Sequence, residues 1–228
     1  AGVNASFSPI VDDVVLPQQP FVDGAPDMSD DIPMLIGFNK DEMTIFVRSQ
    51  PWFGKLTEAQ LTAMSSRDPQ MKKLVEYYKE QRPDDEPTYI FNSALSAGFV
   101  SDSFVLAEQR EEGGAAPTYM YYLTWETNTW DGRLRSTHTL DIPLMFNNVE
   151  EGRALVGTGP EPVTMGEMMS DAWVSFARTG KPSSELLPEW QPYETSERRT
   201  MVLDLEPELA SDPVKGMREI VSSDAGGN

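Results

Sequence analysis

The stretch MLIGFNKDE, which runs from Met34 to Glu42, decides the fold expected for this chain. Its first five residues form a short continuous apolar run, a pattern typical of a strand that is buried on both faces of a sheet. The polar residues follow at once, with Asp41 and Glu42 at their end. The stretch therefore predicts an acidic pair just beyond the carboxyl end of a buried strand.

Outward from this strand, the apolar periodicity predicts helices and two further strands. Helices are expected over residues 57–81, in two pieces broken near Asp68-Pro69, over 88–111 and over 213–222. Whether Gly98 interrupts the second of these helices stays open. Strands are expected over 119–125 and 200–205. Thr164-Met165-Gly166-Glu167 matches a capping box. A further helix is therefore expected to begin there and to end at Gly180.

Strands that alternate with helices indicate the α/β class, with a central, mostly parallel sheet flanked by helices. A hydrophobic share of 39% and an aromatic share of 10% are sufficient for a packed core. Only three strands are expected, whereas an average sheet has roughly five or six. At 228 residues the chain could form one large domain or two small ones, and its sheet is expected to be incomplete without a further segment.

The charge and the residue types argue against several kinds of function. The net charge is −19 and the acidic residues are scattered, which favours a solvated acidic surface and argues against nucleic acid as a partner. Cysteine is absent, so disulfides within the chain and thiolate metal sites are excluded. With one histidine, a zinc site is not expected either, and no cofactor is implied. No apolar run approaches the length of a membrane span.

The single histidine, His138, follows the strand expected over residues 119–125, just as Glu42 follows the first strand. A serine hydrolase needs a base that takes the serine proton, a carboxylate that holds the base, and donors for the oxyanion. In α/β-hydrolases the residues of the triad occur in the chain order Ser, acid, His. Glu42 and His138 have the right order for the acid and the base.

Other roles stay open on the residues alone. His138 could be a structural histidine that bonds with Asp141, and Asp141 could orient the histidine or simply stabilise a turn. Asp41 is the alternative acid, although we expect it to face solvent or a helix cap. Trp52 and Phe53, in the loop after the acid, either line a substrate pocket or cover the neighbouring helices.

Four segments, taken in order, resemble the type-B carboxylesterase family. GFNKDE at residues 37–42 is similar to its acid motif, HTLDIPLMF at 138–146 to its histidine motif, WVSFARTGKP at 173–182 with WQPY at 190–193 to its C-terminal helix and turn, and residues 7–17 to the run before the acid. One departure is Met43, where many members have glycine. The resemblance implies the C-terminal part of an α/β-hydrolase fold, with Glu42 as the triad acid and His138 as the general base.

The nucleophile of such an enzyme is not found in this sequence. The nearest variant of the Gly-x-Ser-x-Gly motif, Ala94-Leu95-Ser96-Ala97-Gly98, follows the acid and lies within an expected helix instead of at a strand-to-helix turn. Ser96 is better explained as a small residue at a helix packing face. The resemblance implies that the serine and the oxyanion hole lie on an N-terminal polypeptide, the partner of this chain in hydrolysing a small-molecule carboxylic ester. A noncatalytic, esterase-like adhesion module and an inert fragment are the alternatives.

Overall fold

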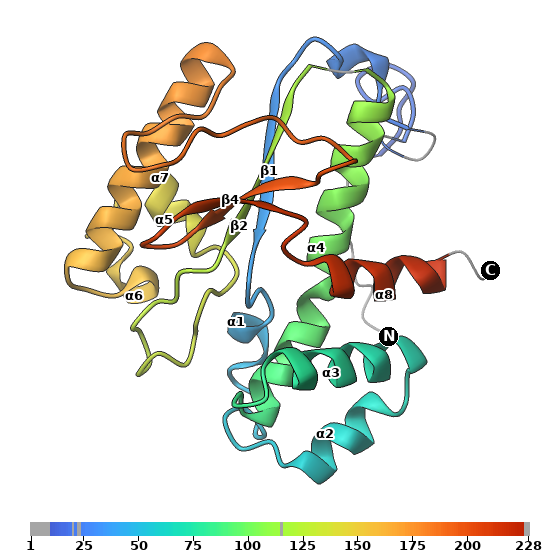
Figure 1. The fold of residues 1–228 in the computed structure, drawn as a ribbon, viewed down its shortest axis with the longest axis vertical. Coiled ribbons are helices and arrows are strands. Elements are labelled where there is room, and N and C mark those ends of the chain that lie inside the picture. The colour runs from blue at the N-terminus through green and yellow to red at the C-terminus, as the bar shows by residue number, and fades with distance from the viewer. Residues whose placement is uncertain (1–9, 20, 22–23, 115, 226–228) are drawn as a thin grey trace.

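The computed structural model describes residues 10–19, 21, 24–114 and 116–225, and a four-stranded sheet lies at its centre (Figure 1). The strands lie in the order β1 (Met34–Asn39), β2 (Thr118–Leu123), β3 (Arg199–Leu203) and β4 (Glu208–Ser211). β1 runs parallel to β2 and β2 parallel to β3, while β4 is antiparallel to β3. The mostly parallel sheet is confirmed, and β4 is an additional strand that the sequence did not predict.

β1 lies at an edge of the sheet and has one strand neighbour among the described residues, β2. Their register pairs Asn39 with Leu123, the last residues of the two strands. Gly37 lies opposite Tyr121, and this glycine lets the two strands approach each other at that point. The segments that leave β1 and β2 therefore start side by side.

Helices cover both faces of the sheet (Figure 1). One face carries the long helix α4 (Pro87–Glu112), against which pack α2 (Glu58–Ser65), α3 (Pro69–Gln81) and α8 (Lys215–Ala225). The other face carries α5 (Asp141–Met145) and α7 (Pro160–Thr179), which pack on each other, and the short α6 (Arg153–Val156). The remaining short helices are η1 (Asp27–Ser29) and α1 (Thr44–Val47).

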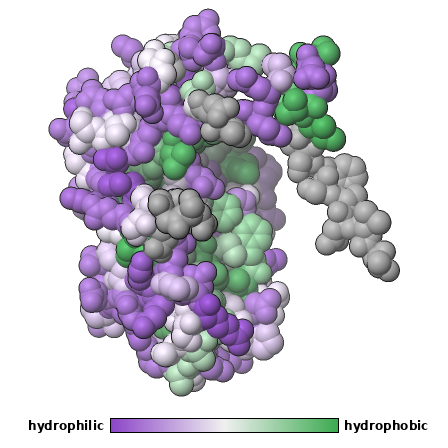
Figure 2. Space-filling view, turned by 90° about the vertical axis from the view of Figure 1, so that its right-hand side faces the viewer, coloured by the Kyte–Doolittle hydropathy of each residue, from purple (hydrophilic) through white to green (hydrophobic). Residues whose placement is uncertain are grey.

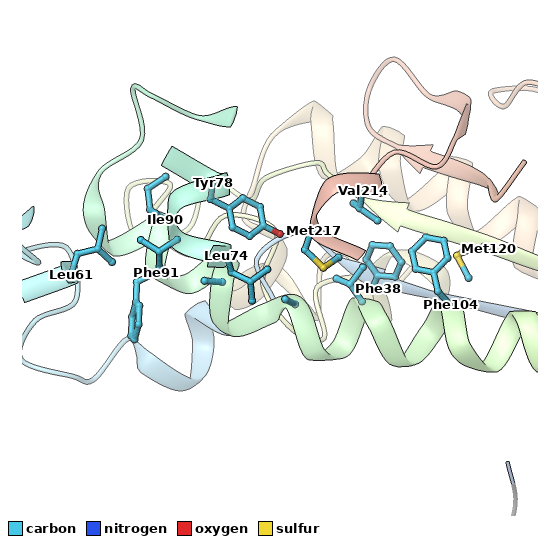
Figure 3. Packing of buried hydrophobic residues seen from close by; sticks show 14 of the residues in the cluster. Phe38, Leu61, Leu74, Tyr78, Ile90, Phe91, Phe104, Met120, Val214 and Met217 are labelled. Atoms are coloured by element: carbon cyan, nitrogen blue, oxygen red, sulfur yellow. The ribbon is translucent and has the colours of Figure 1, made fainter. Parts of the chain in front are cut away.

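The alternating side chains of β2 belong to two separate cores, one on each face of the sheet. Met120 packs on the α4 side, among Phe38, Phe104 and Met217 (Figure 3). Leu123 lies in the other core, which contains the methionines of α7, namely Met165, Met168 and Met169. β2 is therefore buried on both faces, whereas the strand for which this burial was predicted, β1, is only partly buried over its first four residues, because it lies at an edge of the sheet.

The predicted helix break near Asp68 is confirmed, because α2 ends before it and α3 begins at Pro69. Asp68 caps α3 by accepting the backbone N–H groups of Gln70 and Met71, at 2.8 and 3.0 Å. By contrast, α4 continues through Gly98 without interruption. Ala97 and Val100 are buried on either side of the exposed Gly98 and Phe99, and their packing supports a continuous helix.

The predicted capping box at Thr164 is wrong, because α7 begins four residues earlier, at Pro160. Gly157 and Gly159 have positive φ angles of 82° and 112°, which turn the chain just before the helix, and proline suits the first position of a helix. The hydroxyl of Thr164 instead donates to the carbonyl of Pro160 at 3.2 Å, inside the helix. The predicted end is confirmed, since Gly180 adopts the left-handed conformation that terminates α7.

One helix in the described part of the chain, α4, is long and apolar enough to cross a membrane by length and composition. The expectation that no run approaches this length is therefore wrong. Small polar residues interrupt the apolar pattern of α4, yet its most apolar 18-residue window still has a mean hydropathy of 1.3. The core helix of a soluble protein meets the same criteria, and 61% of this window is buried.

Candidate active site

Glu42 and His138 lie on the two segments that leave the sheet side by side: the acid turn, residues 40–42 after β1, and the histidine loop, residues 124–138 after β2. Oε2 of Glu42 lies 2.5 Å from Nδ1 of His138. The glutamate side chain is 7% exposed and the histidine side chain is 37% exposed. The structure thus brings the two residues singled out from the sequence into contact, with the acid buried and the imidazole partly open.

The second carboxylate oxygen of Glu42 is held by the strand that precedes it. Oε1 accepts the backbone N–H of Asn39, the last residue of β1, at 2.7 Å. Burial raises the pKa of Glu42, while the N–H of Asn39 and the imidazole of His138 act in the opposite direction. Both oxygens are therefore engaged, which fixes the carboxylate in an orientation toward Nδ1.

Hydrogen bonds to the backbone join the acid turn to the histidine loop. The N–H of Asp41 donates to the carbonyl of Ser136 at 2.8 Å. The side-chain amide of Asn39 donates to the carbonyl of Thr137, also at 2.8 Å. These bonds form at the two residues directly before the histidine, so the backbone that carries the imidazole is fixed relative to the acid.

A further carboxylate of the site, Asp141, belongs to the first turn of α5. One of its oxygens accepts the phenol O–H of Tyr121 at 2.8 Å, and the other accepts the side-chain amide of Asn39 at 3.3 Å. Asn39 therefore contacts the acid, the histidine loop and Asp141 at once. Sequence reasoning missed Asn39 and Tyr121, and the available signal was their place on the two strands that lead into the site.

Asp41, the alternative acid, does not face solvent or cap a helix, so that expectation is wrong. Its side chain is fully buried, and neither of its carboxylate oxygens accepts a hydrogen bond from the described residues. The backbone of Asp41 pairs with Thr137 in an isolated parallel bridge, which extends the pairing beyond β1 and draws the side chain inside. Burial raises the pKa of Asp41, while the charges of Lys40 and Arg135 oppose this rise.

A hollow of about 280 Å³ opens beside the Glu42–His138 contact. His138 packs against the rings of Phe46 and Phe99, with centroid distances of 5.1 and 5.6 Å. Large apolar side chains on α1, α4 and α5, or at the end of α5, are 41% to 72% exposed: Phe46, Phe99, Val105, Ile142 and Phe146. Figure 2, which looks onto the side of the molecule that carries α4, shows apolar side chains gathered beside a largely polar surface. Patches of this kind mark places where a ligand or another polypeptide binds.

Three other residues weighed from the sequence do not line this hollow. Trp52 and Phe53 pack edge-on against aromatic rings of α4, with centroids 5.7 and 6.3 Å apart, so both cover the helix. Ser96 is buried inside α4, where its hydroxyl donates to the carbonyl of Asn92 at 2.8 Å and accepts the N–H of Met43 at 3.1 Å. Its place in mid-helix agrees with a packing role. Within the described ranges, no group of three or more histidine or acidic side chains is placed to hold a metal ion.

In α/β-hydrolases the acid of the triad precedes the histidine along the chain. Here a carboxylate and a histidine occur in this order, on segments that follow two parallel strands, and they are in contact. The model of the carboxylesterase family matches residues 2–219. The chain belongs to the carboxylesterase family.

The relatives show how much of the fold this chain represents. It is 27% identical over 221 residues to the para-nitrobenzyl esterase of Bacillus subtilis (strain 168), a match that covers 93% of this chain and 42% of that protein. It is 24% identical to the phenmedipham hydrolase of Pseudarthrobacter oxydans, over 91% of this chain and 42% of that protein. The solved carboxylesterase EST55 of Geobacillus stearothermophilus aligns with a TM-score of 0.75 and 30% identity, over 96% of this chain and 46% of that one. The chain spans less than half the length of these relatives, which confirms that it has part of an α/β-hydrolase fold.

Proposed function

We propose that this chain provides the acid, Glu42, and the general base, His138, of a serine hydrolase that cleaves carboxylic esters. The nucleophilic serine and the oxyanion hole belong to a companion segment, a stretch of polypeptide outside residues 1–228. These residues are then the C-terminal portion of one α/β-hydrolase domain. The observation that carries the proposal is the contact of 2.5 Å between Oε2 of Glu42 and Nδ1 of His138.

Because Glu42 occupies Nδ1, the imidazole of His138 has Nε2 available for the serine hydroxyl. Nε2 takes the proton as the serine oxygen attacks the ester carbonyl, and the carboxylate of Glu42 stabilises the imidazolium that forms. The tetrahedral intermediate collapses to an acyl-enzyme when Nε2 returns this proton to the leaving alcohol. Water then gives a proton to Nε2 and attacks the acyl-enzyme, and Nε2 returns this proton to the serine oxygen as the acyl bond breaks, which releases the carboxylic acid and restores both residues.

The free edge of β1 supports a companion segment that adds a strand to the sheet. The N–H groups of Met34 and Lys40 donate to carbonyls on the β2 side. In a parallel ladder, the intervening residues Leu35 and Gly37 then direct their N–H groups to the opposite side, where the described residues place no strand. An unpaired edge of this kind is a template for another strand. A strand docked there lies beside the acid turn.

The apolar surroundings of the imidazole support a small-molecule ester as substrate. Two relatives are named a para-nitrobenzyl esterase and a phenmedipham hydrolase. In this chain, Phe46 and Phe99 place two exposed rings against His138, next to the hollow. Aromatic side chains beside a binding site contact the apolar groups of a ligand. We therefore expect an ester with an apolar acyl or alcohol group.

A fluorophosphonate probe, which labels activated serines, tests the proposal. The experiment uses the full-length protein, by which we mean residues 1–228 together with the companion segment. We expect the label on the companion segment, and we expect His138→Ala to abolish labelling and ester turnover. Glu76→Gln, at an exposed acid of α3, is the control and should leave both unchanged. The melting temperature of each variant establishes that it is folded.

Each alternative predicts a different result. Turnover by His138→Ala at the wild-type rate would overturn the assignment of the base. Label on this chain would point back to Ser96 as the nucleophile. A folded full-length protein that takes no label would favour a noncatalytic binding module.

A further inference from the structure

We propose that Arg135 is a positioning residue of this site, which holds the histidine loop to the beginning of α4 through an ion pair with Asp85 and a stacking contact with Tyr89. The proposal rests on the proposed function, because it concerns how His138 is held. Arg135 precedes His138 by three residues and does not line the hollow beside the imidazole. Its effect on the reaction would therefore pass through His138.

The ion pair between Arg135 and Asp85 is a two-point contact. Nη1 lies 2.9 Å from Oδ2 and Nη2 lies 2.8 Å from Oδ1, the fork geometry in which a guanidinium binds a carboxylate with directional specificity. The two side chains are 16% and 19% exposed, so solvent screens this pair less than a surface pair. Burial by itself would raise the pKa of Asp85, but the hydrogen bonds and charge of Arg135 lower it below its ordinary value.

The guanidinium of Arg135 also lies on an aromatic face. Its central carbon, Cζ, is 3.5 Å from the ring centroid of Tyr89, well within the range of a cation–π contact. Tyr89 is buried in the first turn of α4, and its hydroxyl donates to the carbonyl of Arg133 at 3.3 Å. Two residues of the histidine loop are thus fastened to one buried tyrosine.

The partners of Arg135 lie at the beginning of α4, where Asp85 is partly buried and Tyr89 is buried. Asp85 lies in the turn between α3 and α4, where its N–H donates to the carbonyl of Arg82 at 3.1 Å. Tyr89 belongs to α4, whose buried side chains form much of the core on that face of the sheet. The clamp, defined as Asp85, Tyr89 and Arg135, therefore ties a loop to a core helix.

The clamp lies where the histidine loop turns toward the acid. Arg135 has a φ angle of 51°, the left-handed conformation that residues with side chains rarely adopt, so this turn depends on support from its surroundings. The next two residues, Ser136 and Thr137, are fully buried and accept the bonds from the acid side. A shift at Arg135 therefore passes through two buried residues to the imidazole.

A loosened histidine loop would widen the range of distances between Nδ1 of His138 and Oε2 of Glu42 without removing either group. The carboxylate would then stabilise the imidazolium less, so the base would be weaker and fewer complexes would have reactive geometry. Substrate binding would change little, because the clamp does not line the hollow. The expected signature is a lower kcat at nearly constant KM, with a lower apparent pKa of the base in the pH profile of kcat/KM.

Arg135→Lys tests the clamp in the full-length protein, because lysine keeps the charge but loses the fork and the stacking plane. We expect kcat to fall by about 10- to 100-fold, because a misplacement of a catalytic group by about 1 Å lowers the rate by up to about 100-fold. KM should stay within about twofold of wild type. The midpoint of the pH profile should move to lower pH.

Arg218→Lys is the matched control. Arg218 makes a comparable two-point pair with Asp212, at 14% and 15% exposure, and does not line the hollow. The melting temperature of Arg218→Lys should fall about as much as that of Arg135→Lys, while its kcat and pH profile should equal those of wild type. An equal loss of kcat in Arg218→Lys would mean that stability alone is involved, and it would overturn the proposal.

Wild-type kcat and a wild-type pH profile in Arg135→Lys would also overturn the positioning role. If Arg135→Lys does not fold, Tyr89→Phe and Tyr89→Leu provide the same test, since phenylalanine keeps the ring and leucine does not. Leucine should then lower kcat much more than phenylalanine, and equal values would contradict the stacking contact. An inactive His138→Ala together with a fully active Arg135→Lys would overturn the clamp and leave the proposed function standing.

Discussion

Oε2 of Glu42 lies 2.5 Å from Nδ1 of His138, while the other oxygen of the same carboxylate accepts the N–H of Asn39 at 2.7 Å. The orientation of the Glu42 carboxylate thus depends on both of its oxygens acting as hydrogen-bond acceptors. A glutamine has one oxygen and one amide nitrogen, so it can satisfy only one of these two contacts as an acceptor. If its oxygen keeps the N–H of Asn39, its amide faces Nδ1 and forces the imidazole proton onto Nε2.

Glu42→Gln should therefore lower kcat by about 10⁴-fold, because an imidazole with its proton on Nε2 cannot accept the serine proton. Steady-state turnover of a chromogenic ester by the full-length protein measures this loss. Glu150→Gln, at an exposed acid that pairs with Arg153, is the control and should retain full activity. A folded Glu42→Gln variant with wild-type kcat would assign the acid to another residue.

Ser96 supports the acid turn from α4, and its removal tests both this role and its rejection as nucleophile. Its hydroxyl accepts the N–H of Met43, the residue after the acid. Ser96→Ala leaves this N–H without that acceptor, so we expect the free energy of unfolding to fall by about 1–2 kcal/mol while fluorophosphonate labelling continues. Ser103→Ala should cost less, because that hydroxyl bonds to the carbonyl of Phe99 in its own helix. Loss of labelling in a folded Ser96→Ala variant would be evidence against the proposed serine.

The buried strands and the helix break at Asp68 could be predicted because their signals are local. An apolar run, or an aspartate before a proline, acts within a few residues of its own position. The predicted capping box failed because Thr164 matches a local pattern, whereas Pro160 and two preceding glycines start the helix one turn earlier. β4 could not be predicted from the sequence, because none of its residues is buried and it therefore lacks an apolar pattern.

Within the candidate site, chain order and family resemblance predicted the pair, Glu42 and His138, and the structure places the two in contact. Their catalytic roles stay a prediction. The place of Asn39 and Tyr121 on the two strands was visible in the sequence, but their contacts also depend on the pairing of β1 with β2, which joins residues far apart in the chain. The burial of Asp41 likewise depends on a bridge to a residue that is distant in the chain.

Asp41 should make the stability of the protein depend on pH. Burial raises its pKa in the folded state above the unfolded value, so the folded state binds this proton more tightly. The contribution is fully present below the unfolded pKa of about 4 and is lost as the pH rises through the folded value. Asp41→Asn removes the ionisable group, so the variant should be more stable than wild type at pH 7. This advantage should disappear near about pH 4.

Urea unfolding of the full-length protein at both pH values measures the effect of Asp41→Asn. Asp102→Asn is the control, because it removes a negative charge from an exposed side chain of α4 and not from a buried one. Its gain in the free energy of unfolding at neutral pH should be much smaller. An Asp41→Asn variant that is less stable than wild type at pH 7 would contradict the prediction. It would mean that the nearby charges of Lys40 and Arg135 stabilise the ionised carboxylate by more than burial costs.

Gly37 and Tyr121 lie opposite each other in β1 and β2, and a Cβ on Gly37 would overlap both the carbonyl oxygen and the ring of Tyr121. The carbonyl belongs to the backbone and cannot rotate away. Gly37→Ala should therefore lower the free energy of unfolding by about 1–3 kcal/mol. It should also lower kcat, because Tyr121 donates to Asp141 at 2.8 Å and its displacement would reach the site.

The same chemical change at Gly98 separates this clash from the flexibility of glycine itself. A Cβ on Gly98 in α4 would meet no atom within 4 Å. Alanine is favoured over glycine in a helix interior by about 0.5–1 kcal/mol, so Gly98→Ala should gain roughly that much stability. Urea unfolding of the two variants should thus show shifts of opposite sign. A gain at both positions would contradict the close approach of β1 to β2, on which the contact between the acid turn and the histidine loop depends.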